Sequence, residues 1–140
     1  MRGFSLIELI LVMAIIAVLF TVSVPLAINF YNTRQLDVQE SGLVQALRRA
    51  QLKAMLGEGS SSFGVDINSG RYVLFSGDSY QNRDPSLDEI FTLPGSFLVT
   101  PGEVIFNSLT GTSSYVGDIN LTIGNRSETI NINEAGRIEY

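Results

Sequence analysis

Hydrophobic residues are concentrated near the N-terminus of the chain. No formally charged side chain lies between Glu8 and Arg34. The apolar run from Leu9 to Ile28 has about the 20 residues that an α-helix needs to cross the roughly 30 Å hydrocarbon core of a bilayer. A secretory signal peptide has a shorter apolar core, of about 7 to 15 residues, followed by small residues at a cleavage site. The pattern therefore predicts a membrane-spanning helix rather than an ordinary signal peptide.

The segment from Pro25 to Leu56 keeps a helical pattern but becomes amphipathic. Its apolar residues recur at intervals of three, four and seven, which place them on one helix face. They are Leu36, Leu43, Leu47, Ala50 and Ala54. Gly57 and Gly59 form a stop signal directly after the segment. We therefore expect one helix from about Phe4 to Leu56, with its second half packed on a folded head.

The stretch from Thr21 to Pro25 is the weakest part of this helix. β-Branched residues and Ser are poor helix formers. Pro25 also removes a backbone hydrogen-bond donor. We therefore expect a helix kink or local melting at Pro25.

After Gly59 the hydrophobic period changes to two, which is typical of β-strands. A β-hairpin is expected from Phe63 to Phe75, with its turn at Asn68-Ser69-Gly70. The polar segment 76–89 is expected to be a surface loop. Further short strands are expected at 90–93, 97–100, 104–106, 119–123 and 128–133. The fold class is thus α+β, with a long N-terminal helix packed on a small antiparallel sheet or sandwich.

Composition excludes most kinds of catalytic site. The chain has no Cys and no His, which excludes disulfides, thiol nucleophiles, Cys/His zinc sites and imidazole acid–base chemistry. No Ser/Lys nucleophile motif is recognisable either. We therefore expect no enzyme, no catalytic residues and no cofactor.

Charge argues against nucleic acid as a partner. The formal net charge is −5, and the part from Arg34 onward holds eight of the nine basic and thirteen of the fourteen acidic residues. Phosphate contacts need clustered Lys and Arg, which this acidic body lacks. Segment 76–89 contains several carboxylates without the ligand spacing of an EF-hand, so we expect a solvated acidic loop rather than a metal site.

Glu8 is the unusual residue of the apolar segment. A carboxylate at the bilayer centre costs about 2.5 to 3.5 kcal/mol, and less toward the interface. One explanation is that Glu8 extends to the lipid headgroups near the membrane edge. The other is that it pairs with a cation, which has to be a free amine or belong to another molecule. Arg2 precedes the span, so the positive-inside rule places the N-terminus in the cytoplasm and the body across the membrane.

The segment Gly3-Phe4-Ser5-Leu6-Ile7-Glu8, followed by an apolar helix and Pro25, resembles the N-terminal signature of type IV pilins and type II secretion pseudopilins. The resemblance implies that prepilin peptidase cuts between Gly3 and Phe4 and that Phe4 is then N-methylated. It implies that Glu8 pairs with the N-terminal amine of a neighbouring subunit during assembly, and that Pro25 is the kink-forming proline of the helix.

This resemblance also implies a division of the chain. Residues 1–3 would be a leader peptide, and residues 4–33 a hydrophobic transmembrane or filament-core helix. Residues 34–140 would be the globular head, with the amphipathic helical half to about 57 and a β-rich part over 60–140.

Two looser matches resemble a subgroup of the family, the minor pseudopilins typified by the secretion-system H subunit and the fimbrial T protein. One is the helical segment from Gln45 to Gln51, and the other is Ile130-Asn131-Ile132 leading to Gly136-Arg137-Ile138. Some members of the subgroup bind DNA with a second Arg shortly after the Gly-Arg pair. Glu139 occupies that place here, so DNA binding is not expected.

We therefore expect a structural, minor-type subunit of a type IV pilus or a type II secretion pseudopilus. Its partners would be prepilin peptidase, other pilin or pseudopilin subunits and an inner-membrane assembly platform. It would be a single-pass protein of the bacterial inner membrane with its head outside the cytoplasm, in a pilus or pseudopilus after assembly. The alternative is a membrane-anchored, pilin-like binding module for surface adhesion or DNA uptake that acts outside a filament.

Overall fold

The computed structural model describes residues 5–140, apart from the side chains of Val22 and Ser60. The chain forms two compact units, Met1–Arg34 and Gln35–Tyr140. Helix α1, Leu6–Met55, supplies the described helix of the first unit and the helical segment of the second. The helix is continuous through Pro25, so the local melting that the sequence suggested is not seen. A kink of the helix at Pro25 stays a prediction.

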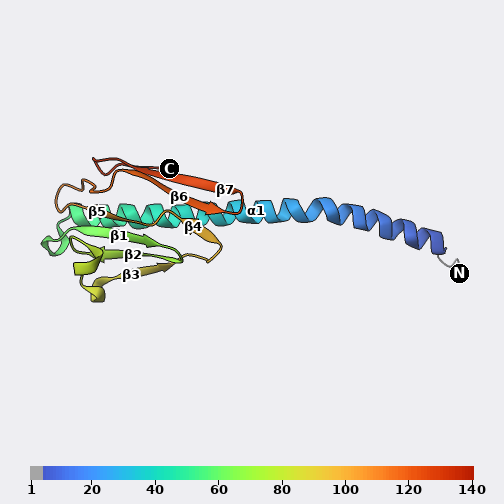
Figure 1. The fold of residues 1–140 in the computed structure, drawn as a ribbon, viewed down its shortest axis with the longest axis horizontal. Helices are drawn as coiled ribbons and strands as arrows, with labels where there is room; N and C mark the ends of the chain where they lie inside the picture. The colour runs from blue at the N-terminus through green and yellow to red at the C-terminus, as the bar shows by residue number, and fades with distance from the viewer. Residues whose placement is uncertain (1–4) are drawn as a thin grey trace. The chain divides into compact units, whose positions relative to one another are not determined.

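The second unit has two four-stranded antiparallel sheets. Sheet A has the order β3-β2-β1-β5, and sheet B has the order β4-β6-β7-β8. The strands are β1 Phe63–Asn68, β2 Arg71–Ser76, β3 Glu89–Thr92, β4 Phe97–Val99, β5 Gly102–Phe106, β6 Gly117–Ile123, β7 Arg126–Ile132 and β8 Ile138–Glu139. Figure 1 shows β1–β3 on one side of the helical segment and β6–β7 on the other. The predicted α+β class, a long helix packed with small antiparallel sheets, is confirmed.

The predicted hairpin is also present. β1 and β2 pair from Phe63 with Ser76 to Asn68 with Arg71. Gly70 completes the two-residue turn with a φ of +88°, a conformation that glycine adopts without steric cost. β8, whose two residues pair with the end of β7, was not predicted because so short a segment carries no periodicity.

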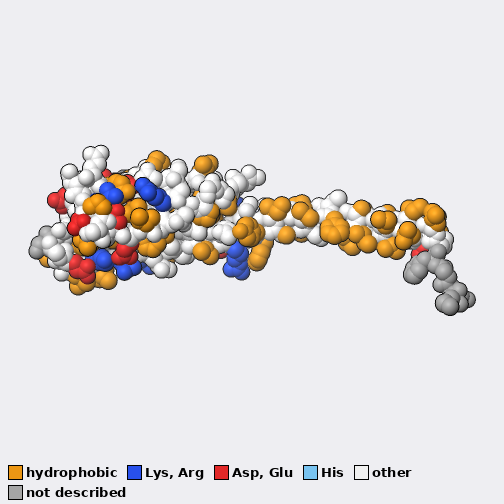
Figure 2. Space-filling model, turned by 90° about the horizontal axis from the view of Figure 1, so that it is seen from below, with side chains coloured by type: hydrophobic (Ala, Val, Ile, Leu, Met, Phe, Trp, Pro, Cys, Tyr) orange, Lys and Arg blue, Asp and Glu red, His pale blue; other side chains and the backbone are white. Residues whose placement is uncertain are grey.

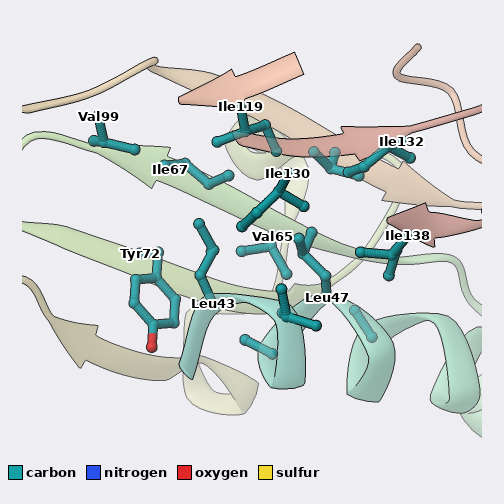
Figure 3. Packing of buried hydrophobic residues seen from close by; sticks show 14 of the residues in the cluster. Leu43, Leu47, Val65, Ile67, Tyr72, Val99, Ile119, Ile130, Ile132 and Ile138 are labelled. Atoms are coloured by element: carbon teal, nitrogen blue, oxygen red, sulfur yellow. The ribbon is translucent and has the colours of Figure 1, made fainter. Parts of the chain in front are cut away.

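The core of this unit lies where the helical segment meets the inner faces of both sheets. The five apolar residues of the predicted helix stripe are each at most 1 % exposed. Figure 3 shows Leu43 and Leu47 of α1 close to Val65 of β1 and Ile130 of β7. The core side chains thus come from three layers, which are sheet A, the helical segment and sheet B. The helix therefore covers the apolar inner face of each sheet.

Segment 77–88 differs from the predicted solvated loop. It contains two short 3₁₀ helices, Tyr80–Asn82 and Pro85–Leu87. The ring of Tyr80 packs edge-on against Phe75 at 5.6 Å, and the Arg83 guanidinium lies 3.6 Å from the Tyr80 ring centroid. Arg83 Nε donates to both carboxylate oxygens of Asp88, whose side chain is only 7 % exposed. The sequence predicted a solvated Asp88, because the sequence of a polar segment does not show which cation a carboxylate pairs with.

Gln51 connects the helix to two distant loops. Its side-chain Nε2 donates to the carbonyl oxygens of Gly111, at 3.1 Å, and of Gly136, at 2.9 Å. Gly136 has a φ of +80°, and a Cβ there would overlap the Gly111 carbonyl oxygen and crowd the Gln51 amide. This site therefore requires glycine for both its backbone conformation and its space.

We predict that Gly136→Ala destabilises the head more than Gly70→Ala does. Gly70 has a similar positive φ but nothing within 4 Å of its Cβ position. Gly70→Ala should therefore cost about 1–2 kcal/mol for the left-handed conformation alone. Gly136→Ala should cost about 1–3 kcal/mol more, because overpacking adds to that strain. Thermal unfolding followed by circular dichroism measures both, and equal losses would contradict the close packing at Gly136.

A second prediction concerns Asp66, which lies opposite Glu103 in sheet A. Burial, followed by the Glu103 charge, raises the pKa of Asp66 above its ordinary value. Ionisation thus penalises the folded state, and the penalty grows as the pH rises through the folded-state pKa. Asp66→Asn should raise the melting temperature at pH 7 and have little effect below the ordinary pKa of aspartate. Melting curves at both pH values test this, and a stabilisation that is larger in acid would contradict it.

Candidate assembly site

The N-terminal half of α1 carries an apolar surface that nothing in the described structure covers. Among residues 5–140, α1 is the one helix long and apolar enough to cross a membrane, and none of its most apolar window is buried. Exposed side chains occur all around the helix, among them Leu6 at 74 %, Leu11 at 58 % and Phe20 at 64 %. Figure 2 shows hydrophobic side chains along this segment. Since burial of one such side chain is worth about 1.5–3 kcal/mol, this surface requires lipid or other helices around it.

Two hydroxyl groups in this segment are satisfied within the helix itself. Thr21 Oγ1 donates to the Val18 carbonyl oxygen at 2.7 Å, and Ser23 Oγ donates to the Leu19 carbonyl oxygen at 2.9 Å. Such bonds let Thr and Ser enter an apolar medium without unpaired donors. They lie directly before Pro25, whose nitrogen cannot donate to the Thr21 carbonyl. Both effects favour bending at this place.

Glu8 lies in the first turn of α1 with an exposed side chain. The Ser5 carbonyl oxygen accepts from the backbone nitrogens of Glu8, at 3.1 Å, and Leu9, at 3.2 Å. Ser5 and Glu8 also fit the Ser-x-x-Glu sequence pattern of a capping box, which the sequence analysis missed, although no side-chain hydrogen bond joins them in the described part of the chain. A carboxylate in a first turn is stabilised by the positive end of the helix dipole. Glu8 thus has a local structural explanation besides headgroup contact and an intersubunit ion pair.

Of the other predicted site residues, the structure describes Pro25, which is not brought together with Glu8. Gly3 and Phe4, the predicted cleavage and methylation positions, lie outside the described residues. Pro25 is exposed in the interior of α1, several turns after Glu8. Among residues 5–140, no Lys or Arg lies within ion-pair distance of Glu8.

An aromatic and basic cluster marks the other end of the apolar segment. The guanidinium carbon of Arg34 lies 5.2 Å from the ring centroid of Phe30, and the exposed Tyr31 follows Phe30. Aromatic and basic residues of this kind are enriched where a helix leaves the membrane. From Leu6 to Phe30 the helix rises about 37 Å at 1.5 Å per residue, which is enough for a span. A sequence signal for such a boundary is the pair of aromatic residues shortly before Arg34, the first cation after the apolar run.

Comparison with family models gives a match at the N-terminus. Residues 1–24 match the family model described as the prokaryotic N-terminal methylation motif. The match includes Gly3, Phe4 and Glu8 and ends one residue before Pro25. It supports a protein of the type IV pilin and pseudopilin kind, which prepilin peptidase processes. Together with the apolar helix, it also supports membrane anchoring.

No curated protein and no solved structure matches the chain.

Proposed function

We propose that this protein is a structural subunit of a type IV pilus or of a type II secretion pseudopilus. The observation that carries the proposal is a methylation motif placed directly on a helix whose apolar surface is uncovered. A bilayer can cover that surface before assembly, and the helices of other subunits can cover it in a filament. Residues 1–3 are then the leader, residues 4–33 the segment that exchanges lipid for protein, and residues 34–140 the head.

We further propose that the protein is a minor subunit of the subgroup typified by the secretion-system H subunit and the fimbrial T protein. The two segments that resemble this subgroup are joined in the head, since Gln51 donates to the carbonyl oxygen of Gly136. The Gly-Arg cation is already paired, because Arg137 Nε lies 2.9 Å from Glu139 Oε1. The acidic side chain beside this cation opposes contact with a phosphate backbone, which favours a structural subunit over a DNA receptor.

The orientation follows from the same residues. Arg2 stays in the cytoplasm with the leader, and the apolar segment spans the inner membrane once. The head lies outside the cytoplasm, with Phe30 and Arg34 at the outer interface. Prepilin peptidase, an assembly platform and other subunits would act on the membrane-embedded part, which the head does not cover.

We predict that the mature chain begins at Phe4 with a methylated amine. Intact-mass and N-terminal peptide spectra of protein from the native cell measure this directly.

Gly3→Asp should leave the protein as an unprocessed membrane precursor, because the peptidase must fit a small residue at the cut. A mature chain that begins at Met1, or is cut beyond Ile16, would exclude the pilin proposal and favour a binding module with a different anchor.

A further prediction separates the explanations of Glu8. Glu8→Ala and Glu8→Gln should both insert and be processed normally, because removal of a carboxylate makes an apolar helix easier to insert. Both should enter filaments poorly if Glu8 neutralises the amine of a neighbouring subunit. Breaking such a buried pair costs about 3–5 kcal/mol.

Glu8→Gln is the informative variant, because glutamine can replace glutamate in a capping box but carries no charge. If Glu8 acts only as a cap, Glu8→Gln should assemble like the wild type and Glu8→Ala should not. The ratio of protein in sheared filaments to processed protein in the membrane gives the result for each variant. Wild-type incorporation of Glu8→Gln would refute the intersubunit ion pair.

A further inference from the structure

A hollow of about 260 Å³ lies between the second half of α1 and the β2–β3 edge of sheet A. It is lined by Gly42, Gln45, Ala46 and Arg49 of α1, by Tyr72 of β2 and by Phe91 of β3. The rings of Tyr72 and Phe91 stack with their centroids 5.0 Å apart and their planes 12° apart. The stacked rings form an aromatic wall, and the small residues Gly42 and Ala46 leave room on the helix side.

The hydroxyl of Tyr72 is the unusual group in this hollow. The residue is only 4 % exposed, and its oxygen lies 2.9 Å from the position that a Cβ on Gly42 would occupy. Figure 3 shows the hydroxyl end of the ring directed toward the helix. Within residues 5–140 the hydroxyl has no hydrogen-bond partner, yet no fully buried polar side-chain atom is unpaired. The hydroxyl therefore stays accessible to solvent, although its ring is buried.

A buried tyrosine usually pairs its hydroxyl with a protein group, so an unpaired one needs an explanation. Burial also raises the pKa of Tyr72, which keeps the phenol protonated at neutral pH. The hydroxyl is therefore available as a hydrogen-bond donor.

Two further donors border the hollow. The exposed side chain of Gln45 carries a carboxamide nitrogen. Arg49 Nη1 lies 2.8 Å from Glu89 Oε2, but its side chain is 56 % exposed, and a guanidinium has five N–H donors. Lys53 Nζ shares the same carboxylate at 3.3 Å from Glu89 Oε1. Because two cations share Glu89, the guanidinium keeps donors for another acceptor.

We propose that this hollow binds a carboxylate carried on a short apolar stem. The carboxylate oxygens accept hydrogen bonds from Arg49, Gln45 and the Tyr72 hydroxyl. The stem lies along the Tyr72 and Phe91 rings, over Gly42. The volume is slightly below the range of pockets for drug-sized ligands, which suits a stem of a few carbons. The carboxylate can belong to a free small acid or to an acidic side chain of another protein. This site is independent of the proposed pilin function.

The test uses the full chain in detergent micelles, with pentanoate as the probe and pentanamide as the matched neutral probe. Nuclear magnetic resonance follows the side-chain amide of Gln45 and the ring of Tyr72 during titration. We expect saturable shifts with pentanoate and affinity for pentanamide that is at least roughly tenfold weaker, because hydrogen bonds to charged groups are the stronger ones. No saturable shift, or equal affinity for both probes, would overturn the proposal.

Tyr72→Phe is the decisive variant, because it removes only the unpaired hydroxyl and should leave the fold intact. It should weaken pentanoate binding about tenfold, the value of one hydrogen bond to a charged group. Tyr80→Phe, on the other face of sheet A, is the matched control and should bind normally. Arg49→Gln should also weaken binding, whereas Arg48→Gln should not, since Arg48 instead stacks on Tyr140 at 5.1 Å. Unchanged binding by Tyr72→Phe would refute the site.

If Tyr72→Phe unfolds, Gln45→Leu provides the same test at an exposed position. N-acetylglutamate amide then distinguishes the two sources of the carboxylate. Binding at least as tight as that of pentanoate supports a protein side chain, since the added backbone groups remain outside the hollow. Weaker binding than that of pentanoate supports a free small acid.

Discussion

The head depends on one packing constraint, which is that the second half of α1 completes the core of both sheets. Leu43 and Leu47 are fully buried between residues such as Val65 of sheet A and Ile130 of sheet B. Gln51 holds the loops of Gly111 and Gly136 by two hydrogen bonds from the same helix. The helix therefore does not simply cover a finished β-domain, because its removal would expose the apolar faces of both sheets.

In the first unit, the apolar side chains of the same helix are uncovered rather than buried. From Leu6 to Phe30 its apolar side chains have no cover within the described residues, so water is a poor solvent for this part. The second half of α1 thus has an apolar face that the head itself buries. The first half has an apolar surface that only lipid or other subunits can bury. A membrane anchor that later becomes part of a filament needs this combination, since its head must stay folded while the surroundings of the anchor change.

Periodicity alone predicted much of the fold. The helix stripe, the first hairpin and the later strands follow from burial at intervals of three to four residues or of two. The packing of segment 77–88 could not be predicted this way. Phe75 points away from the main core yet is fully buried, because Gly64 leaves space for its ring and Tyr80 covers it. The hollow beside Tyr72 was missed because it depends on a close approach to Gly42, and no local pattern encodes that approach.

Several carboxylates of the head have a cationic partner, which contrasts with Glu8. Asp88 pairs with Arg83, Glu89 with Arg49 and Lys53, and Glu139 with Arg137. Apart from the largely buried Asp88–Arg83 pair, these pairs lie close to water, and pairs of that kind contribute little to stability. Glu8 stands in an apolar helix, where an unpaired carboxylate is expensive, and no cation of residues 5–140 reaches it. Under the proposed cleavage after Gly3, the new N-terminal amine would be positively charged. Pairing of this amine with Glu8 between subunits would lower the cost of both charges, so the energetic gain would appear only after processing and only in an assembly.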